Sequence, residues 1–242
     1  MHPVIQICLL LTAYCFLLSC GGPGERMKDI ETQKTPAPTA TPTEREISGV
    51  FNVSGTAANA TEPYNGVLTV VPSGDVYEFR WALNKGTFAG TAVQLGNVTA
   101  VSYARVGGGK GCGVALYKIA SDGSMEGRVA PWGEGKYGTE KATRVEGDNF
   151  PGKYDVSGRS FDGKDYAGGL TIKKDGAGYD FEWKNDKPQV GFGIWKGSYA
   201  AVSFGGRQCS FALYDISSNG SLEGVWGGQE QVTFGKETAK RQ

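Results

Sequence analysis

Apolar and aromatic residues alternate with polar ones over short runs throughout residues 49–242. In one such run Tyr77, Phe79 and Trp81 share one face while Glu78 and Arg80 share the other, and this period of two predicts a half-buried β-strand. No segment of this region has a sustained helical period, so the pattern predicts an all-β chain. About eight runs fall in its first half, near residues 50–56, 66–72, 76–82, 87–94, 98–104, 113–120, 124–130 and 138–144.

The whole pattern occurs twice along the sequence, as an internal repeat. The offset between equivalent positions falls from 103 residues in the first run to 97 residues in the sixth, so the copies differ by small insertions and deletions in loops. We expect two modules of one fold, at residues 49–146 and 147–242, each able to fold alone. Equivalent positions include Phe51 and Tyr154, Trp81 and Trp183, Cys112 and Cys209.

A sheet of eight short strands avoids exposed edges most simply by closing on itself. We therefore predict two small antiparallel up-and-down β-barrels in tandem, each with its interior filled by side chains or holding one small ligand. Asp122-Gly123 and Asn219-Gly220 follow the sixth run of each copy and predict type I′ hairpin turns. The glycine-rich segment 107–113 is expected to be a flexible hairpin loop, because its lysine is followed by glycine rather than by the Ser or Thr of a phosphate-binding loop.

Residues 1–19 differ in character from the rest of the chain. They contain no Lys, Arg, Asp or Glu, and the largely apolar stretch 4–18 predicts the core of a signal peptide rather than a membrane span. The string Leu17-Leu-Ser-Cys20 resembles the lipobox of bacterial lipoproteins, in which a peptidase cuts before the cysteine and the thiol carries a diacylglycerol. This resemblance implies an acylated Cys20 that anchors an exported chain to the bilayer, with Gly21 implying the outer membrane. The alternative is an ordinary cleaved signal in which Cys20 is incidental.

Residues 20–48 are rich in Pro, Thr, Ala and charged side chains. Such a segment cannot bury enough apolar surface to offset the entropy of ordering it. We expect a disordered, lipidated tether that lifts the folded part off the membrane surface.

Two cysteines remain in the folded part, Cys112 and Cys209, at equivalent positions of the two copies. They either form a disulfide between the modules, if a pseudo-two-fold axis brings them together, or stay as two small buried thiols. Two buried thiols are the preferred interpretation, because equivalent positions in tandem modules usually lie farther apart than the roughly 7 Å that a disulfide allows between Cα atoms.

The order of aromatic and glycine motifs resembles the meander barrels of the avidin and lipocalin-like superfamilies. The motifs run from Phe51 and Tyr154, through Leu-Thr-Val and Leu-Thr-Ile, to the Tyr-x-Phe-x-Trp runs that end at Trp81 and Trp183. They also resemble exported bacterial modules, a few of which are labelled fibronectin-binding. The resemblance implies the fold and a binding role, with a matrix protein such as fibronectin among the partners.

Charge and residue content exclude several functions. Lys plus Arg and Asp plus Glu balance at 25 each, and no basic patch interleaved with aromatics predicts a nucleic-acid partner. The single histidine is His2, inside the signal, so the mature chain has no imidazole for a Ser-His-Asp triad, a Cys-His pair or a histidine-bound metal. We expect no metal, no cofactor and no catalytic residue.

Two glutamates of the first copy, Glu126 and Glu140, recur at the equivalent positions of the second copy as Glu223 and Glu237. A carboxylate pair could serve a hydrolase, which makes a carboxylate-dependent enzyme one alternative function. The preferred interpretation is structural, with these side chains at a barrel rim as partners for Lys or backbone N–H groups.

The aromatic residues are the candidate ligand-binding residues. The stripes of the Tyr-x-Phe-x-Trp runs are expected to fill the barrels or, if a barrel is open, to line a pocket. We predict a non-enzymatic, membrane-anchored lipoprotein whose two barrels bind an extracellular protein or a small apolar molecule, and the other alternative is a structural component of the cell envelope. The candidates are Tyr77, Trp81, Tyr179 and Trp183 in the stripes, and Trp132, Trp195 and Trp226 as an exposed protein-binding patch.

Overall fold

The computed structural model describes residues 44–148, 150–229 and 231–242, and this part of the chain is entirely β-structure with sixteen strands. Within it, no helix is long and apolar enough to cross a membrane. The first copy contributes β1 (Gly49–Thr56), β2 (Pro63–Ser73), β3 (Val76–Leu83), β4 (Gly86–Leu95), β5 (Val98–Arg105), β6 (Gly113–Ile119), β7 (Met125–Pro131) and β8 (Gly138–Glu146). The second contributes β9 (Gly152–Arg159), β10 (Asp165–Asp175), β11 (Gly178–Lys184), β12 (Gln189–Lys196), β13 (Tyr199–Phe204), β14 (Ser210–Ile216), β15 (Leu222–Gly227) and β16 (Gly235–Arg241).

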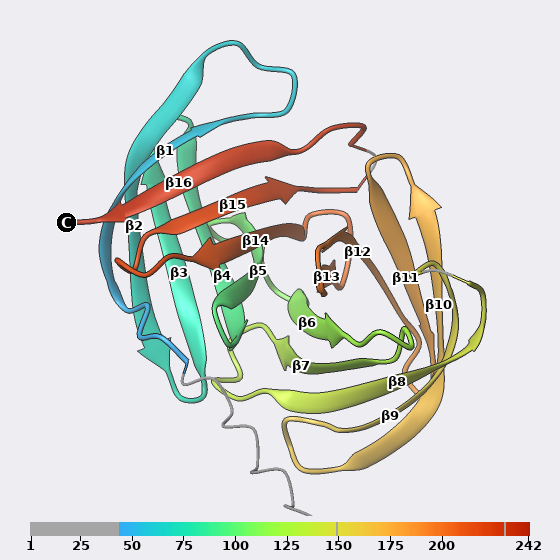
Figure 1. The fold of residues 1–242 in the computed structure, drawn as a ribbon. Coiled ribbons are helices and arrows are strands. Elements are labelled where there is room, and N and C mark those ends of the chain that lie inside the picture. Colours follow the sequence, from blue (N-terminus) through green and yellow to red (C-terminus); the bar gives the residue numbers. More distant parts are fainter. Residues whose placement is uncertain (1–43, 149, 230) are drawn as a thin grey trace, which may run out of the picture. The chain divides into compact units, whose positions relative to one another are not determined.

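The strands form two closed antiparallel barrels of eight strands, which confirms the predicted fold class. Barrel 1 consists of β1–β5 and β14–β16, and barrel 2 consists of β6–β13. Figure 1 shows the red C-terminal strand β16 lying beside the blue strand β1, at opposite ends of the chain. The last three strands of each copy therefore close the barrel of the other copy.

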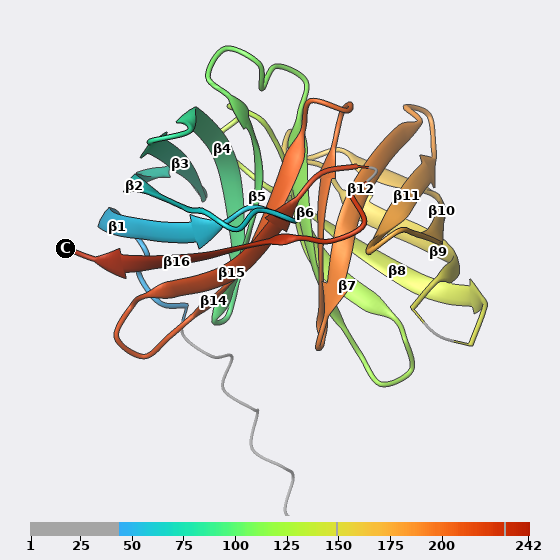
Figure 2. The same cartoon turned by 90° about the horizontal axis from the view of Figure 1, so that it is seen from above.

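This exchange corrects the predicted domain boundaries. Residues 49–146 and 147–242 do not each close a barrel, because β5 pairs with β14 and β13 pairs with β6. In a self-contained meander β5 would pair with β6 and β13 with β14. Both copies carry the same strand pattern, so the fifth strand of either copy can accept the sixth strand of the other. In Figure 2 the orange and red strands β14–β16 lie with the strands of the first copy.

The glycine-rich segments of the two copies are the crossover connections between the barrels. The chain leaves barrel 1 between β5 and β6, through the segment 106–112, and returns between β13 and β14, through the segment 205–209. Gly205 has φ of 107°, and a Cβ at this position would collide with the backbone carbonyl oxygen of Gly111 in the other crossover. Glycine is required here because the two crossovers pass in direct contact.

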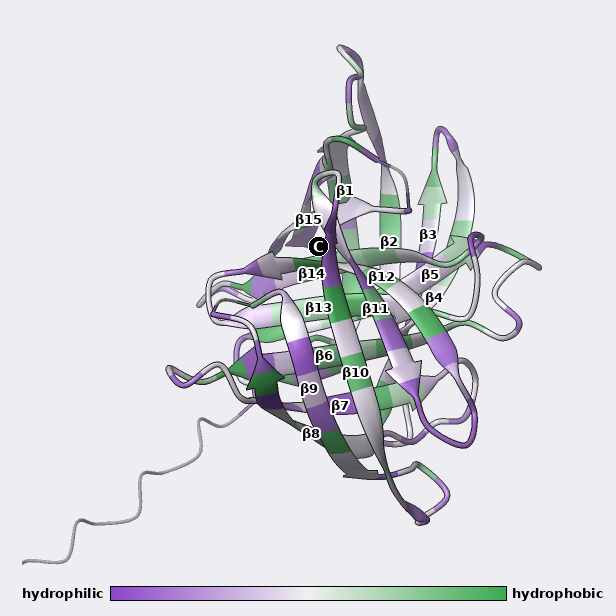
Figure 3. Cartoon of the chain, turned by 90° about the vertical axis from the view of Figure 1, so that its right-hand side faces the viewer, coloured by the Kyte–Doolittle hydropathy of each residue, from purple (hydrophilic) through white to green (hydrophobic). Residues whose placement is uncertain are grey.

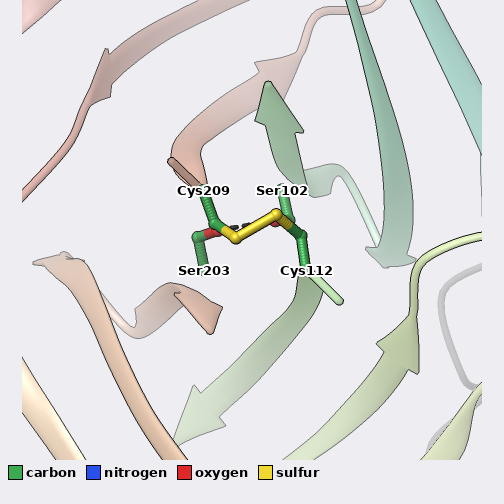
Figure 4. Close-up of a disulfide and its surroundings, with 4 residues drawn as sticks. All are labelled: Ser102, Cys112, Ser203 and Cys209. Atoms are coloured by element: carbon green, nitrogen blue, oxygen red, sulfur yellow. Dashed lines mark hydrogen bonds between the residues drawn. A yellow bond between two sulfur atoms is a disulfide. The ribbon is translucent and has the colours of Figure 1, made fainter. Parts of the chain in front are cut away.

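A disulfide between Cys112 and Cys209 joins the crossovers, with the Cα atoms 5.7 Å apart. The preference for two separate thiols is thus corrected, because the exchange brings equivalent residues of the two copies together. Beside the disulfide, the hydroxyl groups of Ser102 and Ser203, which are also equivalent, form a hydrogen bond of 2.5 Å (Figure 4). Residues that contact their own equivalents lie on a pseudo-two-fold axis, and this axis passes through the two pairs.

The outer faces of the exchanged strands form a third apolar core between the barrels. It includes equivalent residues of the two copies, among them Ala100 with Ala201 and Leu116 with Leu213, all buried. An aromatic group extends this contact, in which Phe211 of β14 lies edge-on to Phe234 at a centroid distance of 5.1 Å. Strands β5 and β6 are buried at nearly every position, because one face lies in a barrel interior and the other in the core between the barrels.

The interior of each barrel is filled by the inward-facing half of the alternating pattern, and this alternation is visible along the strands in Figure 3. The segment before each first strand also covers one end of the barrel. Ile47 is fully buried in the barrel 1 core, and its equivalent Phe150 is buried in barrel 2, where Tyr154 donates a hydrogen bond of 2.6 Å to the Phe150 carbonyl. A large apolar side chain therefore closes one end of each barrel.

The predicted type I′ turns are wrong. Gly123 and Gly220 have positive φ, but Asp122 and Asn219 do not, and both central residues of a type I′ turn require it. The loops are one residue longer than a two-residue turn. In the first loop the N–H of Ala120 donates to the carbonyl of Ser124, and the carboxylate of Asp122 accepts the N–H of Ser124. The side chains of Asp122 and Asn219 thus cap the turns by hydrogen bonding rather than by adopting a left-handed backbone.

The exchange predicts how separated halves behave. Fragments 49–146 and 147–242, expressed alone, should fail to give a cooperatively melting monomer, because each loses the strands of the other half that close its barrel in the full chain, the contact between the crossovers and the core between the barrels. Refolded together under oxidising conditions, they should form a one-to-one complex linked by the Cys112–Cys209 disulfide, detectable on a non-reducing gel and by size-exclusion chromatography. Two monomeric fragments that each melt cooperatively would contradict the exchanged topology.

Candidate functional site

A buried glutamate lies inside barrel 1 and accepts three hydrogen bonds. Glu237 of β16 is 5% exposed. Its Oε1 accepts hydrogen bonds from the Tyr214 hydroxyl at 2.7 Å and the Trp81 indole N–H at 3.0 Å, and its Oε2 accepts one from the Tyr64 hydroxyl at 2.7 Å. All three donors are neutral, so the carboxylate is solvated by side chains without a counter-ion among them.

Barrel 2 contains the same arrangement at the equivalent positions. Glu140 of β8 is 4% exposed, and its Oε1 accepts hydrogen bonds from Tyr117 at 2.6 Å and from the Trp183 indole at 3.1 Å. Its Oε2 accepts a hydrogen bond from Tyr166 at 2.8 Å. We call each set of one glutamate, two tyrosines and one tryptophan a glutamate cluster.

Each glutamate cluster is assembled from both copies of the repeat. In barrel 1, Tyr64 and Trp81 come from the first copy, whereas Tyr214 and Glu237 come from the second. The strand period explains the inward direction of the glutamate, because Glu237 lies two positions from Gly235 and from the fully buried Ala239. The clusters therefore exist only when the strands are exchanged as observed.

Burial shapes the protonation of the barrel 1 cluster. Desolvation raises the pKa of Glu237 above its ordinary value of 4.5, while the hydrogen bonds from Tyr64, Tyr214 and Trp81 act in the opposite direction. Burial and the negative charge of Glu237 both raise the pKa of Tyr64 and of Tyr214. The two phenols consequently remain protonated and act as donors to the carboxylate.

A cavity of about 140 Å³ opens above the Glu237 cluster. It lies at the end of barrel 1 away from Ile47, because its rim includes Ala57, just after β1, and Lys85, in the turn between β3 and β4. The walls are mainly aromatic, and Trp81 and Tyr103 contact each other there with ring centroids 5.5 Å apart. The remaining lining residues are Tyr64, Leu83, Phe88, Tyr214, Trp226 and Glu237.

Barrel 2 keeps the glutamate cluster but lacks two rings of the aromatic wall. The residue opposite Trp81 in β4 is Phe88, and the residue opposite Trp183 in β12 is Gln189. In the same way Trp226 faces Ala212, whereas Val129 faces the equivalent Ala115. Two large rings of barrel 1 are thus replaced by an amide and a small aliphatic side chain in barrel 2.

A larger hollow of about 770 Å³ reaches the Glu140 cluster, with Glu140 and Tyr166 among its lining residues, and its character is different. Charged residues of both signs border it, among them Lys118, Glu126, Arg159 and Asp165. Several of these charges already pair with one another, as Arg159 does with Asp165 at 3.2 Å. Its aromatic lining residues are Tyr166 and Tyr199, so it lacks the extensive aromatic wall of the barrel 1 cavity.

The structure separates the seven predicted ligand-binding aromatics. Trp81 and Trp226 line the cavity of barrel 1, while Tyr77 packs against the core of that barrel outside the cavity lining. Trp183 is buried against Glu140 in barrel 2. The other candidates lie elsewhere: Tyr179 and the 40%-exposed Trp195 pack around Phe150, and Trp132 is half-buried after β7.

Trp132, Trp195 and Trp226 were expected to form an exposed patch, and the structure does not gather them. Trp226 is on β15 in barrel 1, whereas Trp195 is on β12 in barrel 2. The reason is the exchange, since residues late in the second copy belong to the first barrel. Cys20, the predicted lipidation site, lies outside the described residues.

The glutamates divide into two kinds. Glu126 and Glu223 are exposed, and Glu126 pairs with Lys141 at 3.3 Å as a rim residue would. The rim interpretation is wrong for Glu140 and Glu237, which point inward and bind aromatic donors. Their recurrence beside small inward-facing residues was the available signal. In the described part of the chain no group of three or more His, Cys, Asp or Glu side chains could hold a metal ion.

Comparisons with protein-family models, with curated proteins and with solved structures gave no match to this chain. The resemblance to avidin and lipocalin-like barrels and to bacterial lipoproteins therefore stays a prediction. The geometry of the barrel 1 cavity is then the guide to function.

The raised pKa of Glu237 predicts a pH-dependent stability difference. Because the folded state binds the Glu237 proton more tightly than the unfolded chain does, wild-type protein should lose stability relative to Glu237→Gln as the pH rises above the ordinary carboxyl value of 4.5. Urea unfolding of both proteins between about pH 4 and pH 8 measures this difference, with equal m-values as the check that both unfold alike. A difference that stays constant over the range would contradict the inferred direction.

Proposed function

We propose that this chain is an exported, non-enzymatic binding protein in which barrel 1 takes a small ligand. The observation that carries the proposal is the aromatic cavity above Glu237, which has the features of a ligand site: concave, mostly apolar and with a few converging polar groups. A barrel of eight strands has room for one small ligand. Barrel 2, with Gln189 and Val129 in place of Phe88 and Trp226, serves as the partner that supplies β6 and β13 to the shared core.

The arrangement of carboxylates supports a binding role over a hydrolytic one. Glycoside hydrolysis by two carboxylates needs them about 5–10 Å apart on either side of one bond. Glu140 and Glu237 lie in the interiors of different barrels, and each is engaged by three donors. The cavity, in turn, argues against a purely structural envelope component, in which we would expect the aromatic face to be packed closed.

Binding in the cavity can be tested by filling it. Ala57 lines the rim, so Ala57→Phe should occlude the cavity without removing a core side chain, and Ala60→Phe, in the same loop but exposed, is the matched control. We expect benzyl alcohol to bind the wild type and the control, and to bind Ala57→Phe at least about ten-fold more weakly, a difference of about 1.4 kcal/mol. Ligand-observed NMR titration measures this. Equal binding by all three proteins would refute the proposal.

We further propose that the chain is anchored to the bacterial cell envelope through an acylated Cys20, in keeping with the lipobox-like string before it. Cys20→Ala should then move to the soluble fraction or accumulate with its signal uncleaved, and it should lose incorporation of labelled palmitate. Cys112→Ala, which removes a thiol of the disulfide, is the control that should keep the label. Persistent labelling of Cys20→Ala would exclude this anchor.

A further inference from the structure

The walls of the barrel 1 cavity place one buried carboxylate among aromatic rings, and we propose that this cavity binds the quaternary alkylammonium head of a cationic ligand. The inference rests on the proposed binding function and deepens it by naming the ligand class. Three features of the cavity carry it: a carboxylate without a cationic partner, a lining of aromatic rings and a matching size.

The charge of Glu237 has no cationic partner in the described part of the chain. Its three hydrogen bonds come from neutral groups, and no lysine or arginine there forms an ion pair with it. A buried carboxylate is costly unless it is paired, so a cation entering the cavity would gain from its field in a poorly solvated setting. The charge of Glu237 is therefore available to a ligand.

The hydrogen-bonding capacity of the carboxylate is largely used, and this selects the kind of cation. A carboxylate has about four lone-pair sites, and three of them are occupied by Tyr64, Trp81 and Tyr214. A primary ammonium would leave most of its three N–H donors unpaired in the apolar cavity. A quaternary ammonium has no donor to satisfy and needs only charge and contact.

Aromatic faces supply that contact. Cations bind over the faces of Trp, Tyr and Phe, and quaternary ammonium groups are commonly held in aromatic cages of this kind. The rings that line the cavity are Tyr64, Trp81, Phe88, Tyr103, Tyr214 and Trp226.

The size of the cavity fits a compact head group rather than a whole large ligand. An apolar cavity of about 150 Å³ is known to hold benzene, so about 140 Å³ accommodates a group of similar bulk such as trimethylammonium. The remainder of the ligand would extend out of the cavity past Lys85 at the rim. The ammonium of Lys85 opposes a cation only weakly, because it is exposed and screened by solvent, and it suits a ligand whose far end is neutral or anionic.

Choline and its uncharged isostere 3,3-dimethylbutan-1-ol test the proposal, since they share a shape and differ in charge. Isothermal titration of the full chain should show choline binding at least ten-fold more tightly than the isostere. Glu237→Gln should remove most of this preference, while Glu140→Gln, the matched change in barrel 2, should leave it intact. Should Glu237→Gln fold poorly, Trp226→Leu removes a cavity ring without touching the hydrogen bonds of Glu237, and it should weaken choline several-fold more than the isostere.

The outcomes separate this inference from the proposed function. If the isostere and benzyl alcohol bind and choline binds no more tightly, barrel 1 is a binding module for neutral ligands and the inference is overturned. The inference is also overturned if the preference for choline survives both Glu237→Gln and Trp226→Leu, because the site would then lie elsewhere. If no probe binds the wild type, the proposed function itself fails.

Discussion

The pairing of β5 with β14 and of β13 with β6 is the interaction that closes both barrels and holds them together. Each pairing joins a strand of one copy of the repeat to a strand of the other. Their outer faces then meet in a third apolar core along the pseudo-two-fold axis. Without this exchange the crossovers would not approach, and Cys112 would not reach Cys209. A chain made of two similar modules thus behaves as one interlocked unit.

Exchange also explains why the residues of the Glu237 cluster are distributed along the chain as they are. Glu237 stands near the C-terminus, yet its donors Tyr64 and Trp81 lie more than 150 positions earlier in the chain. The cluster in barrel 2 repeats the arrangement with the copies reversed. Since both clusters are kept, the buried glutamate serves the stability of either barrel, by satisfying two phenols and an indole that would otherwise be buried without partners.

The proposed function depends on the positions at which the two barrels differ. The positions that surround Glu237 carry Phe88 and Trp226, and the equivalent positions around Glu140 carry Gln189 and Val129. A shared scaffold with one aromatic wall changed is a route by which a duplicated module acquires a ligand site without losing its fold. The cavity of barrel 1 then combines a carboxylate that both barrels have with two rings, Phe88 and Trp226, that only barrel 1 has.

Local sequence pattern was enough to predict the strands and their faces. Period-two alternation and the glycine and aspartate breaks located all eight runs of the first copy within a few residues of their observed bounds, and closure into barrels followed from the need to protect edges. The burial of Trp81 and Trp183 was readable in the same way. The burial of β5 and β6 on both faces, which forms the core between the barrels, was not predicted.

The choice of partner for each strand, in contrast, was made in three dimensions. A β-strand recognises a partner through backbone groups and a hydrophobic face, and β6 and β14 offer nearly the same face to β5, so local pattern cannot distinguish them. That choice depends on the contact between the crossovers and on the core between the barrels, both of which join residues about one hundred positions apart. The glutamate clusters and the cavity depend on the same choice, because a side chain pointing into a barrel has a chemical role only once the opposite wall is known.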